Sequence, residues 1–301
     1  MKKLLFVYNP HAGKGEIGRN LSALFSIFTK AGYLVSVRPT LAARDGQQFI
    51  ARHAGEYDLV VCSGGDGMLH ELFSGVLSAG VETRCGYIPS GTVNDFASSL
   101  KISRSPLEAA SMLMQEHFRR IDAGVFNGQT FAYVAAFGMF TAVSYSTDQR
   151  MKNTFGAAAY VIDALRTLDL IHFQDAAIHA RVQVNGQEYE DDFLFGMAGN
   201  TLSVAGLTNL IPSGARMDDG LLDYLLIRMP RSIQDFDRIR AALMGHRLDV
   251  PEILCGQAPA LEIETDQPVG WTLDGEYGGD VKSASLTIRE KAVCLAVPEE
   301  N

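Results

Sequence analysis

Long apolar runs are missing from this sequence of 301 residues. No stretch reaches the roughly 18 to 20 apolar residues that a membrane-spanning helix needs, so we expect no transmembrane helix. The apolar segment that follows the two N-terminal lysines is only about six residues long before Asn9 and Pro10, too short for the hydrophobic region of a signal peptide. These absences predict a cytoplasmic protein.

Cysteine pairs and an excess of basic charge are also missing. The four cysteines lie far apart and form no Cys-x-x-Cys pair, which argues against a zinc site and against a disulfide framework. The net charge is −9, so nucleic acid is not an expected partner, because binding to a phosphate backbone depends on clustered cations. Hydrophobic residues make up 47% and charged residues 20%, as in ordinary globular proteins, and the length predicts two domains.

Residues 1–122 alternate short apolar runs with amphipathic segments. The runs KLLFVYN and YDLVVCSGG are predicted to be strands covered on both faces, and YLVSVRPT and RCGYIPSG are weaker strand candidates. Segments 17–30, 45–53 and 68–78 are predicted to be helices. Strand, glycine turn and helix in repetition predict right-handed βαβ units, and therefore a parallel α/β domain over residues 1–122.

Residues 123–289 follow a different pattern. Asn127-Gly128 and Asn185-Gly186 join strand-like runs and predict β-hairpins. Two predicted helices, 155–168 and 232–244, interrupt further strand-like segments. We expect an antiparallel, β-rich second domain over residues 123–289, and the C-terminal segment, about residues 290–301, is a candidate to return to the first domain.

Three glycine-bearing turns follow predicted strands of the first domain: NPHAGKG (9–15), SGGDGMLHE (63–71) and PSGTVNDFA (89–97). Ligands of open parallel sheets bind beyond the carboxyl ends of the strands, so these turns are expected to converge on one ligand. Glycine lets a phosphate approach backbone N–H groups, and Asp66 and Asp95 offer carboxylates for a divalent cation. Each loop alone has a plainer alternative, an ordinary strand-to-helix turn. Neither GxxxxGK[ST] nor GxGxxG follows the first strand, so a P-loop and a Rossmann dinucleotide site are not indicated.

The ordered set NPHAGKG, GGDG, PSGTVNDFA, DDGLLD (218–223) and LDGE (273–276) resembles the diacylglycerol kinase catalytic-domain family over essentially the whole chain. GGDG alone is shared with NAD kinases and phosphofructokinases, whereas GTxNDFA together with DDGxLD is typical of the lipid kinases. The resemblance implies a nucleotide-binding α/β domain and a β-sandwich-like second domain, as in NAD kinases and diacylglycerol kinases. It also implies an ATP- and Mg²⁺-dependent lipid kinase, cytoplasmic and peripheral to the membrane during catalysis, and it suggests a homodimer.

The resemblance carries a nucleotide site over to this sequence position by position. The residues it implies for ATP binding are Asn9, Pro10, His11, Ala12, Gly13, Lys14, Thr40, Gly65, Asp66, Gly67, Met68, Leu69, His70, Glu71 and Thr92.

The resemblance also implies metal and catalytic residues. Asp66, Asp95 and Asp122 match positions tied to the active-site Mg²⁺ and its waters. Asp219, with the backbone oxygens of Arg216 and Leu221, matches a second, structural Mg²⁺ site. The implied catalytic residues are Asp66, Asp274 and Glu276, with Glu276 as the proton acceptor from the lipid hydroxyl.

Two positions depart from the family. Met68 stands where threonine is usual and His70 where asparagine is usual, and neither a thioether nor an imidazole reproduces a small hydroxyl or an amide. These departures leave open a catalytically impaired nucleotide-binding regulator. The shared GGDG leaves open a kinase of a soluble substrate, such as an NAD kinase.

Overall fold

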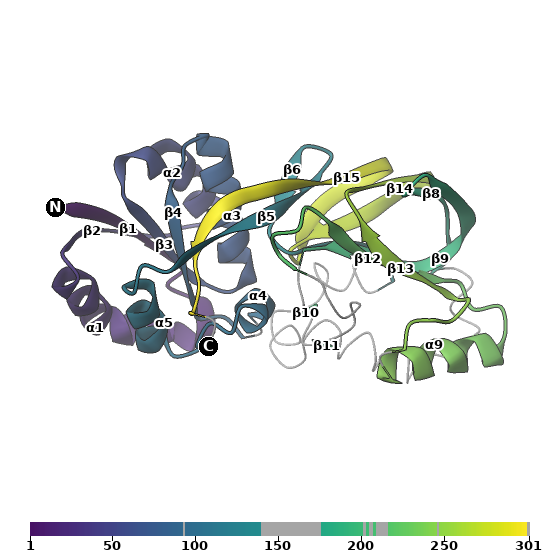
Figure 1. Ribbon diagram of the computed structural model, residues 1–301, viewed down its shortest axis with the longest axis horizontal. Helices are drawn as coiled ribbons and strands as arrows, with labels where there is room; N and C mark the ends of the chain where they lie inside the picture. Colours follow the sequence, from purple (N-terminus) through teal and green to yellow (C-terminus); the bar gives the residue numbers. More distant parts are fainter. Residues whose placement is uncertain are drawn as a thin grey trace. The chain divides into compact units, whose positions relative to one another are not determined.

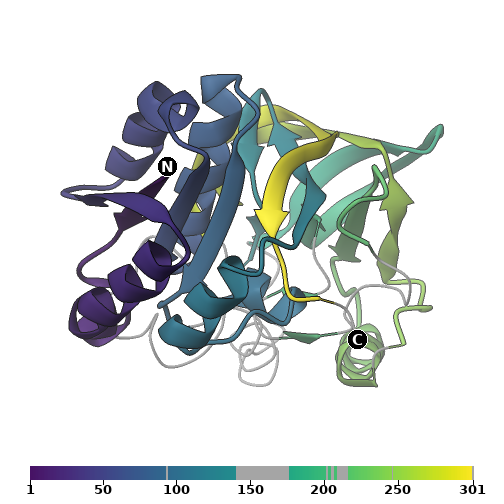
Figure 2. The ribbon, with the colours of Figure 1, turned by 60° about the vertical axis from the view of Figure 1, so that its left-hand side comes forward.

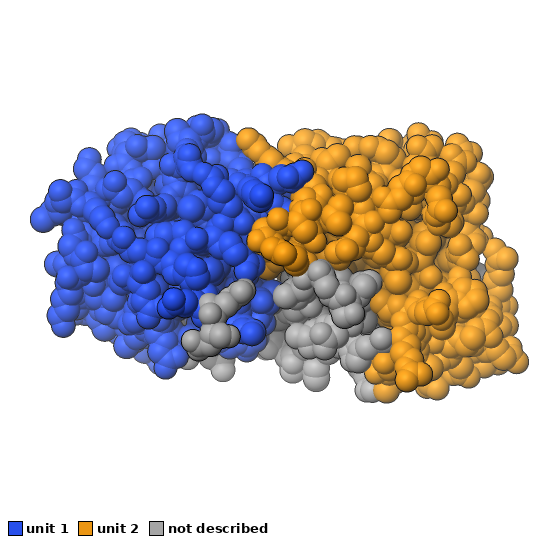
Figure 3. Space-filling model, viewed as in Figure 1, with its two compact units in different colours: residues 1–123, 290–301 blue, residues 124–289 orange. Residues whose placement is uncertain are grey.

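The computed structural model describes residues 1–92, 94–139, 176–200, 203–204, 207–208, 216–245 and 247–299. The chain divides into two compact units (Figure 3): unit 1 is Met1–Ala123 with Glu290–Asn301, and unit 2 is Gly124–Arg289. The helix predicted over 155–168 lies outside the described residues, as do the side chains of Lys14 and Asp95. No helix in the described ranges is long and apolar enough to cross a membrane.

Unit 1 contains a sheet of parallel strands. In spatial order the strands are the end of β15 (Glu276–Ala296), β4 (Arg84–Pro89), β3 (Leu59–Gly64), β1 (Lys2–Tyr8) and β2 (Tyr33–Pro39). All six residues of β3 are buried, which explains the apolar run over its first four residues, 59–62. The four strands predicted in this part of the chain are therefore present.

The helices of unit 1 connect and cover these strands. They are α1 (Glu16–Lys30), α2 (Asp45–His53), α3 (Asp66–Ala79), α4 (Asp95–Ser99) and α5 (Pro106–Leu113), with short 3-10 turns η1 (Ala12–Gly15) and η2 (Ala54–Glu56). Helices α2 and α3 pack together, and so do α1 and α5. Figure 2 shows these two pairs on opposite faces of the strands. The three predicted helices are confirmed, and the short α4 and α5 are additions.

Unit 2 is β-rich, and the pairs among β7, β8, β9, β12, β13, β14 and β15 are antiparallel. Its strands are the end of β5 (Phe118–Phe126), β6 (Gln129–Phe131), β7 (Val134–Gly138), β8 (Ile178–Val184), β9 (Gln187–Gly199), β10 (Ser203–Val204), β11 (Leu207–Thr208), β12 (Leu222–Arg228), β13 (Ile253–Ala258), β14 (Ala260–Leu273) and the first part of β15. Helix α9 (Ile233–Gly245) follows β12 (Figure 1). The predicted order of an α/β part followed by a β-rich part is confirmed.

Asn-Gly turns make two hairpins of unit 2. Asn127-Gly128 joins β5 to β6, and Asn185-Gly186 joins β8 to β9. All four residues have positive φ, between 46° and 83°, as type I′ hairpins require. Both hairpins were predicted from these dipeptides.

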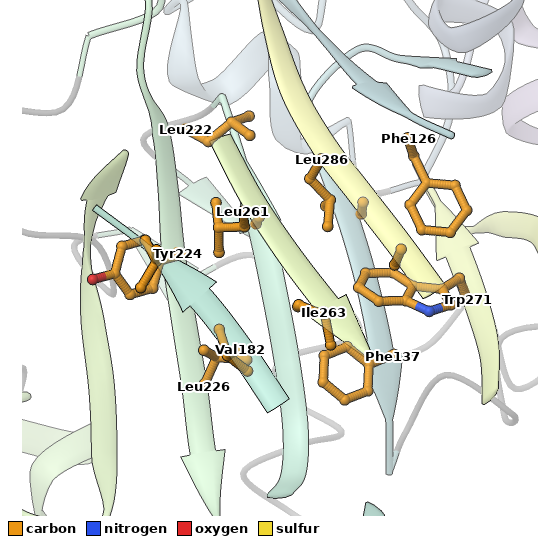
Figure 4. Packing of buried hydrophobic residues seen from close by; sticks show 14 of the residues in the cluster. Phe126, Phe137, Val182, Leu222, Tyr224, Leu226, Leu261, Ile263, Trp271 and Leu286 are labelled. Carbon is orange, nitrogen blue, oxygen red and sulfur yellow. The ribbon is translucent and has the colours of Figure 1, made fainter. Parts of the chain in front are cut away.

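The core of unit 2 is centred on Trp271 of β14. Its ring centroid lies 4.8 Å from that of Phe126 and 4.7 Å from that of Phe137 (Figure 4). Full burial of a large apolar side chain stabilises a fold by about 1.5–3 kcal/mol, so this cluster anchors β14 firmly. Leu273, also buried in this core, is the last residue of β14 and comes directly before Asp274. The core therefore fixes the start of the LDGE turn.

Candidate active site

The three glycine loops of unit 1 lie at one edge of its sheet, because they follow the parallel strands β1, β3 and β4. Backbone hydrogen bonds join neighbouring loops. The Asn9 N–H donates to the Ser63 carbonyl at 3.0 Å, and the Ser90 N–H donates to the Gly64 carbonyl at 2.8 Å. The three loops therefore lie next to one another, and we call residues 9–15, 63–71 and 89–97 the glycine-loop cluster.

The glycines of this cluster are required by close backbone contacts between loops. A Cβ on Gly13 would lie 1.9 Å from the Ser90 carbonyl oxygen, and Gly13 has φ of +52°. A Cβ on Gly91 would lie 2.5 Å from Gly65 Cα. Ordinary strand-to-helix turns make no such contacts with one another, so packing between loops explains glycine here. Gly13, Gly65, Gly67 and Gly91 are nevertheless partly exposed, so some backbone of these loops is accessible.

The first loop is organised by Asn9. Its side-chain oxygen accepts the His11 N–H at 2.9 Å, and its carbonyl accepts the Ala12 N–H at 3.2 Å. These bonds fold residues 9–12 into a tight turn that continues into η1. Pro10 and Gly13 are half-buried and His11 is exposed, so the turn is accessible at the surface.

The second loop ends at the N-terminus of α3, which begins at Asp66 directly after Gly65. The N–H groups of a first helical turn have no acceptor within the helix, and this end carries a partial positive charge. Asp66 and Gly67 therefore present backbone suited to a phosphate. A carboxylate at Asp66 is also favourable in this first turn.

Several side chains that the resemblance implies for ATP binding make contacts within unit 1. Both oxygens of Glu71 accept backbone N–H groups at the start of α2, from Arg44 at 3.0 Å and Gln47 at 3.1 Å. Met68 is buried and packs against Gly46 and Gly64, where an added Cβ would lie within 2.6 Å of its atoms. The Glu71 and Met68 side chains therefore stabilise the segments that pack against the glycine-loop cluster.

The remaining residues of the predicted nucleotide site differ in how deeply they are buried. Leu69 is fully buried, and Thr40 is nearly so, with its N–H bonded to the Tyr8 carbonyl at 2.9 Å. His70 Nε2 lies 3.5 Å from Ser74 Oγ, one turn later on α3. Thr92 is exposed in the third loop.

Asp122 is buried in β5, and its carboxylate accepts a hydrogen bond from the backbone. Its Oδ1 accepts the Lys291 N–H at 2.6 Å. Lys291 has φ of +48°, so this bond stabilises an unusual backbone conformation in β15. The structure thus gives Asp122 a role in holding the returning C-terminal strand within unit 1.

The LDGE turn of unit 2 holds two carboxylates in different environments. Asp274 and Gly275 have φ of +51° and +85° and form a two-residue hairpin between Leu273 and Glu276. The buried Asp274 carboxylate accepts three backbone N–H bonds, from Ala132, Tyr133 and Val134, at 2.6–3.1 Å. Glu276 is exposed at the start of β15, so its carboxylate is accessible.

The DDGLLD segment of unit 2 contains a buried carboxylate that sequence reasoning gave no role. Asp223 in β12 is 1% exposed, and its Oδ1 accepts Gln257 Nε2 at 2.9 Å. Its Oδ2 has no hydrogen-bond partner among the described residues. Burial, and secondarily the charge of Asp219, raises the pKa of Asp223 to about 7. The signal in the sequence is a single acidic residue within the apolar run LLDYLLI.

These residues fit a divalent cation. Asp219 is exposed, and its Oδ1 accepts the Leu221 N–H at 3.1 Å, while Arg216 Nε donates to Asp218 Oδ1 at 3.0 Å. An unsatisfied buried carboxylate oxygen near a second carboxylate is a donor set that Mg²⁺ or Ca²⁺ favours. In the part of the chain that the structure describes, no three His, Cys, Asp or Glu side chains gather to hold a metal, so carbonyl oxygens or waters would complete the shell.

Two family models match the chain. The model described as the diacylglycerol kinase catalytic domain matches residues 3–126, and the model described as the YegS C-terminal NAD kinase beta sandwich-like domain matches residues 134–297. Residues 3–126 therefore belong to the diacylglycerol kinase catalytic-domain family, and residues 134–297 to the YegS C-terminal domain family. The resemblance drawn from the ordered motifs is therefore confirmed.

Relatives match along nearly the whole chain. A diacylglycerol kinase of Staphylococcus carnosus (strain TM300) is 29% identical over 290 residues, covering 96% of this chain and 93% of that protein. A diacylglycerol kinase of Staphylococcus aureus (strain MRSA252) is 29% identical over 300 residues, covering 99% and 93%. Both relatives are named diacylglycerol kinases, and both matches extend over the two units.

Solved structures share the fold. The crystal structure of a diacylglycerol kinase from Bacillus anthracis str. Sterne gives a TM-score of 0.83 at 24% identity and covers 98% of this chain and 97% of that one. A second crystal structure from the same organism gives a TM-score of 0.86 at 24% identity, with coverage of 98% and 95%. Both similarities extend over the two units.

Proposed function

We propose that this protein transfers the γ-phosphate of ATP to the hydroxyl of diacylglycerol or a closely similar lipid, with Mg²⁺. The observation that carries the proposal is the convergence of three glycine loops at one edge of the unit 1 sheet. Phosphoryl transfer depends mainly on positioning and on stabilising the charge of the phosphates. Bare backbone beside a helix N-terminus supplies both.

ATP phosphates are proposed to bind the glycine-loop cluster through backbone N–H groups. The first loop would contribute its 11–13 segment and the second loop Asp66 and Gly67. Buried side chains such as Met68 do not prevent this, because N–H groups are independent of the side chain that follows them. Mg²⁺, when bound near Asp66, would offset negative charge on the phosphates.

Glu276 is the proposed proton acceptor from the lipid hydroxyl. It is exposed, whereas both oxygens of Asp274 are occupied by backbone N–H groups. A general base must reach the proton that it removes, which favours the exposed carboxylate. Asp274 is the proposed positioning residue of the same turn.

A second Mg²⁺ is proposed at Asp219, with the backbone oxygens of Arg216 and Leu221. Asp223 would complete its environment, since its buried Oδ2 lacks a partner in the described part of the chain. This ion would stabilise the loop that precedes β12. No step of the reaction depends on it.

The lipid is proposed to be met at a membrane surface, transiently, by a cytoplasmic homodimer. Diacylglycerol partitions into bilayers, so its kinase must visit one. Co-sedimentation with vesicles that contain diacylglycerol tests the first point, and light scattering of the purified protein tests the second.

Transfer of labelled γ-phosphate from ATP to lipids in mixed micelles tests the activity. Diacylglycerol, sphingosine, ceramide and phosphatidylglycerol would be compared with NAD. Glu276→Gln should lower the rate by about 10²- to 10⁴-fold, the usual contribution of a general base. Glu264→Gln, an exposed glutamate on β14, is the matched control and should keep wild-type activity.

The outcomes separate the alternatives. Labelled NAD without labelled lipid would indicate a kinase of a soluble substrate. Tight ATP binding without transfer to any acceptor would indicate a regulator, in keeping with Met68 and His70.

A further inference from the structure

Tyr87 lies fully buried in β4 between two of the glycine loops. Its hydroxyl lies 3.1 Å from the Gly64 carbonyl oxygen and 3.2 Å from Asn94 Oδ1, and it donates its hydrogen to them. Gly64 ends β3, and Asn94 precedes α4. One hydroxyl therefore joins the loop after β3 to the loop after β4.

Both acceptors of this hydroxyl also hold neighbouring backbone. Asn94 Oδ1 accepts the Gly91 N–H at 3.1 Å, and Asn94 Nδ2 donates to the Gly91 carbonyl at 2.7 Å. The Gly64 carbonyl accepts the Ser90 N–H at 2.8 Å. Asn94 adopts φ of +54°, a conformation that asparagine tolerates better than most residues. The bonds around Tyr87 thus fix the positions of residues 90 and 91 against the end of β3.

We infer that Tyr87 is a positioning residue for ATP binding: its buried hydroxyl locks the glycine loops after β3 and β4 together. The aromatic ring is fully buried, so we assign it no direct contact with the nucleotide. Its effect passes through the backbone of Gly64 and Gly91, which lies at the surface proposed to receive the phosphates. The identity of the ligand as ATP rests on the proposed function. The locking of the loops by Tyr87 is independent of that function.

The chemistry of the hydroxyl supports a permanent structural bond. Burial, followed by the negative charge of Asp66, raises the pKa of Tyr87 well above its ordinary value. The group therefore stays protonated and remains a donor. Nearby residues of β4 are apolar or glycine, so the two loop acceptors account for the polar tip of an otherwise apolar side chain. The one polar side-chain atom of Tyr87 is therefore used in hydrogen bonds to the loops.

Tyr87→Phe removes this hydroxyl while keeping the ring. Tyr33→Phe is the matched control, because Tyr33 is also buried in unit 1 and its hydroxyl donates to Glu116 Oε1 at 3.0 Å, away from the glycine loops. Each variant loses a tyrosine hydrogen bond, so a general loss of stability should affect both. Thermal unfolding of each variant establishes that it is folded.

The first readout is amide hydrogen exchange of the ATP-free protein. Tyr87→Phe should speed exchange at the Ser90 and Gly91 N–H groups by about threefold or more, because a net hydrogen bond contributes a few-fold to tenfold in an equilibrium. Tyr33→Phe should leave both rates unchanged. Unchanged rates in Tyr87→Phe, or equal acceleration in Tyr33→Phe, would overturn the locking of the loops.

The second readout is ATP affinity by calorimetry, together with the KM for ATP and for lipid. Tyr87→Phe should weaken ATP binding by about three- to tenfold and raise the KM for ATP, with the KM for lipid unchanged. Equal ATP affinity in Tyr87→Phe and wild type would overturn the link to nucleotide binding. If wild-type protein binds no ATP, the proposed function fails, and the exchange rates still decide whether Tyr87 locks the loops.

Discussion

The Asp274 carboxylate accepts the backbone N–H of Ala132 at 2.6 Å, although the two residues are 142 positions apart in the sequence. Two further N–H bonds from the same segment reach this carboxylate. Glu276, two residues away, is exposed. One turn therefore contains a carboxylate that organises backbone and a carboxylate that is available for chemistry.

Asp274→Asn should destabilise the protein, because an amide can accept with only one of its two polar atoms and carries no charge. Losing part of a buried, charge-assisted set of bonds costs about 1–3 kcal/mol. Glu276→Gln should change the free energy of unfolding by less than about 0.5 kcal/mol. Urea unfolding of the two variants measures this difference. Equal destabilisation by both would show that the turn does not distinguish its two acidic residues.

Glu71→Gln should destabilise α2. Both Glu71 oxygens accept N–H groups that open this helix, as an N-cap side chain does, so the expected cost is about 1 kcal/mol. Glu56→Gln, at an exposed glutamate of the same unit, is the control and should cost less than about 0.5 kcal/mol at pH 8. Denaturant unfolding of both variants provides the comparison. A control as costly as Glu71→Gln would contradict this role.

Two glycine substitutions in unit 1 should have opposite signs. Gly13→Ala places a Cβ 1.9 Å from the Ser90 carbonyl oxygen at a positive φ, so we expect displacement of the first and third loops and weaker ATP binding. Gly18 lies inside α1 with no atom within 4 Å of an added Cβ, so Gly18→Ala should stabilise by about 0.5–1 kcal/mol. Thermal unfolding and ATP calorimetry measure both effects. A stabilising Gly13→Ala would mean that the loops are not in contact.

The contribution of His179 to the stability of the fold should depend on pH. Its Nδ1 lies 2.9 Å from Asp192 Oδ1 across the β8–β9 pair, and this bond, with help from Glu190, raises the pKa of His179 above its ordinary value. The ion pair stabilises the folded protein fully at a pH below the pKa of His179 in the unfolded chain. This stabilisation is lost as the pH rises through the pKa of His179 in the folded protein. Because the pair is exposed, it contributes at most about 1 kcal/mol.

Asp192→Asn should lower the pKa of His179, measured by NMR titration, and reduce stability at pH 5.5 but not at pH 9. Glu188→Gln is the control, because Glu188 bonds Gln183 and not His179. A pKa of His179 that stays the same in Asp192→Asn would remove the pair as its cause.

Mg²⁺ should raise the unfolding temperature of the wild-type protein, and EDTA should reverse the shift. An ion present at a hundred times its Kd stabilises the state that it binds by about 2.7 kcal/mol. Asp219→Asn should abolish this response, whereas Asp237→Asn, on the exposed side of α9, should keep it. An undiminished shift in Asp219→Asn would place the ion elsewhere.

Local signals explain what the sequence predicted well. Helix 17–30 is observed as Glu16–Lys30 and helix 45–53 as Asp45–His53, because amphipathic spacing and flanking turn residues mark both ends. The Asn-Gly hairpins were predictable because their φ values favour those residues. The helices α4 and α5 have five and eight residues, too few to show a period.

Long-range partners explain what the sequence left open. Glu71 belongs to a motif that resembles an ATP-binding segment, yet its acceptors are used by N–H groups 24 and 27 residues away. The role of Asp274 depends on a segment more than 100 residues earlier in the chain. Tyr87 looks like an ordinary strand residue until the positions of Gly64 and Asn94 are known. The motifs indicated the class of chemistry. The tertiary contacts show which residues of these motifs hold the backbone in place and which remain accessible.

β15 starts in unit 2, and its last residues pair with Arg84 and Cys85 of β4. During synthesis, β4 therefore remains an open sheet edge until almost the whole chain has left the ribosome. Unit 1 cannot finish folding before unit 2 has been translated, although most of it is made first. An exposed strand edge is an aggregation risk, so this nascent chain should depend on chaperones more than an uninterrupted N-terminal domain would.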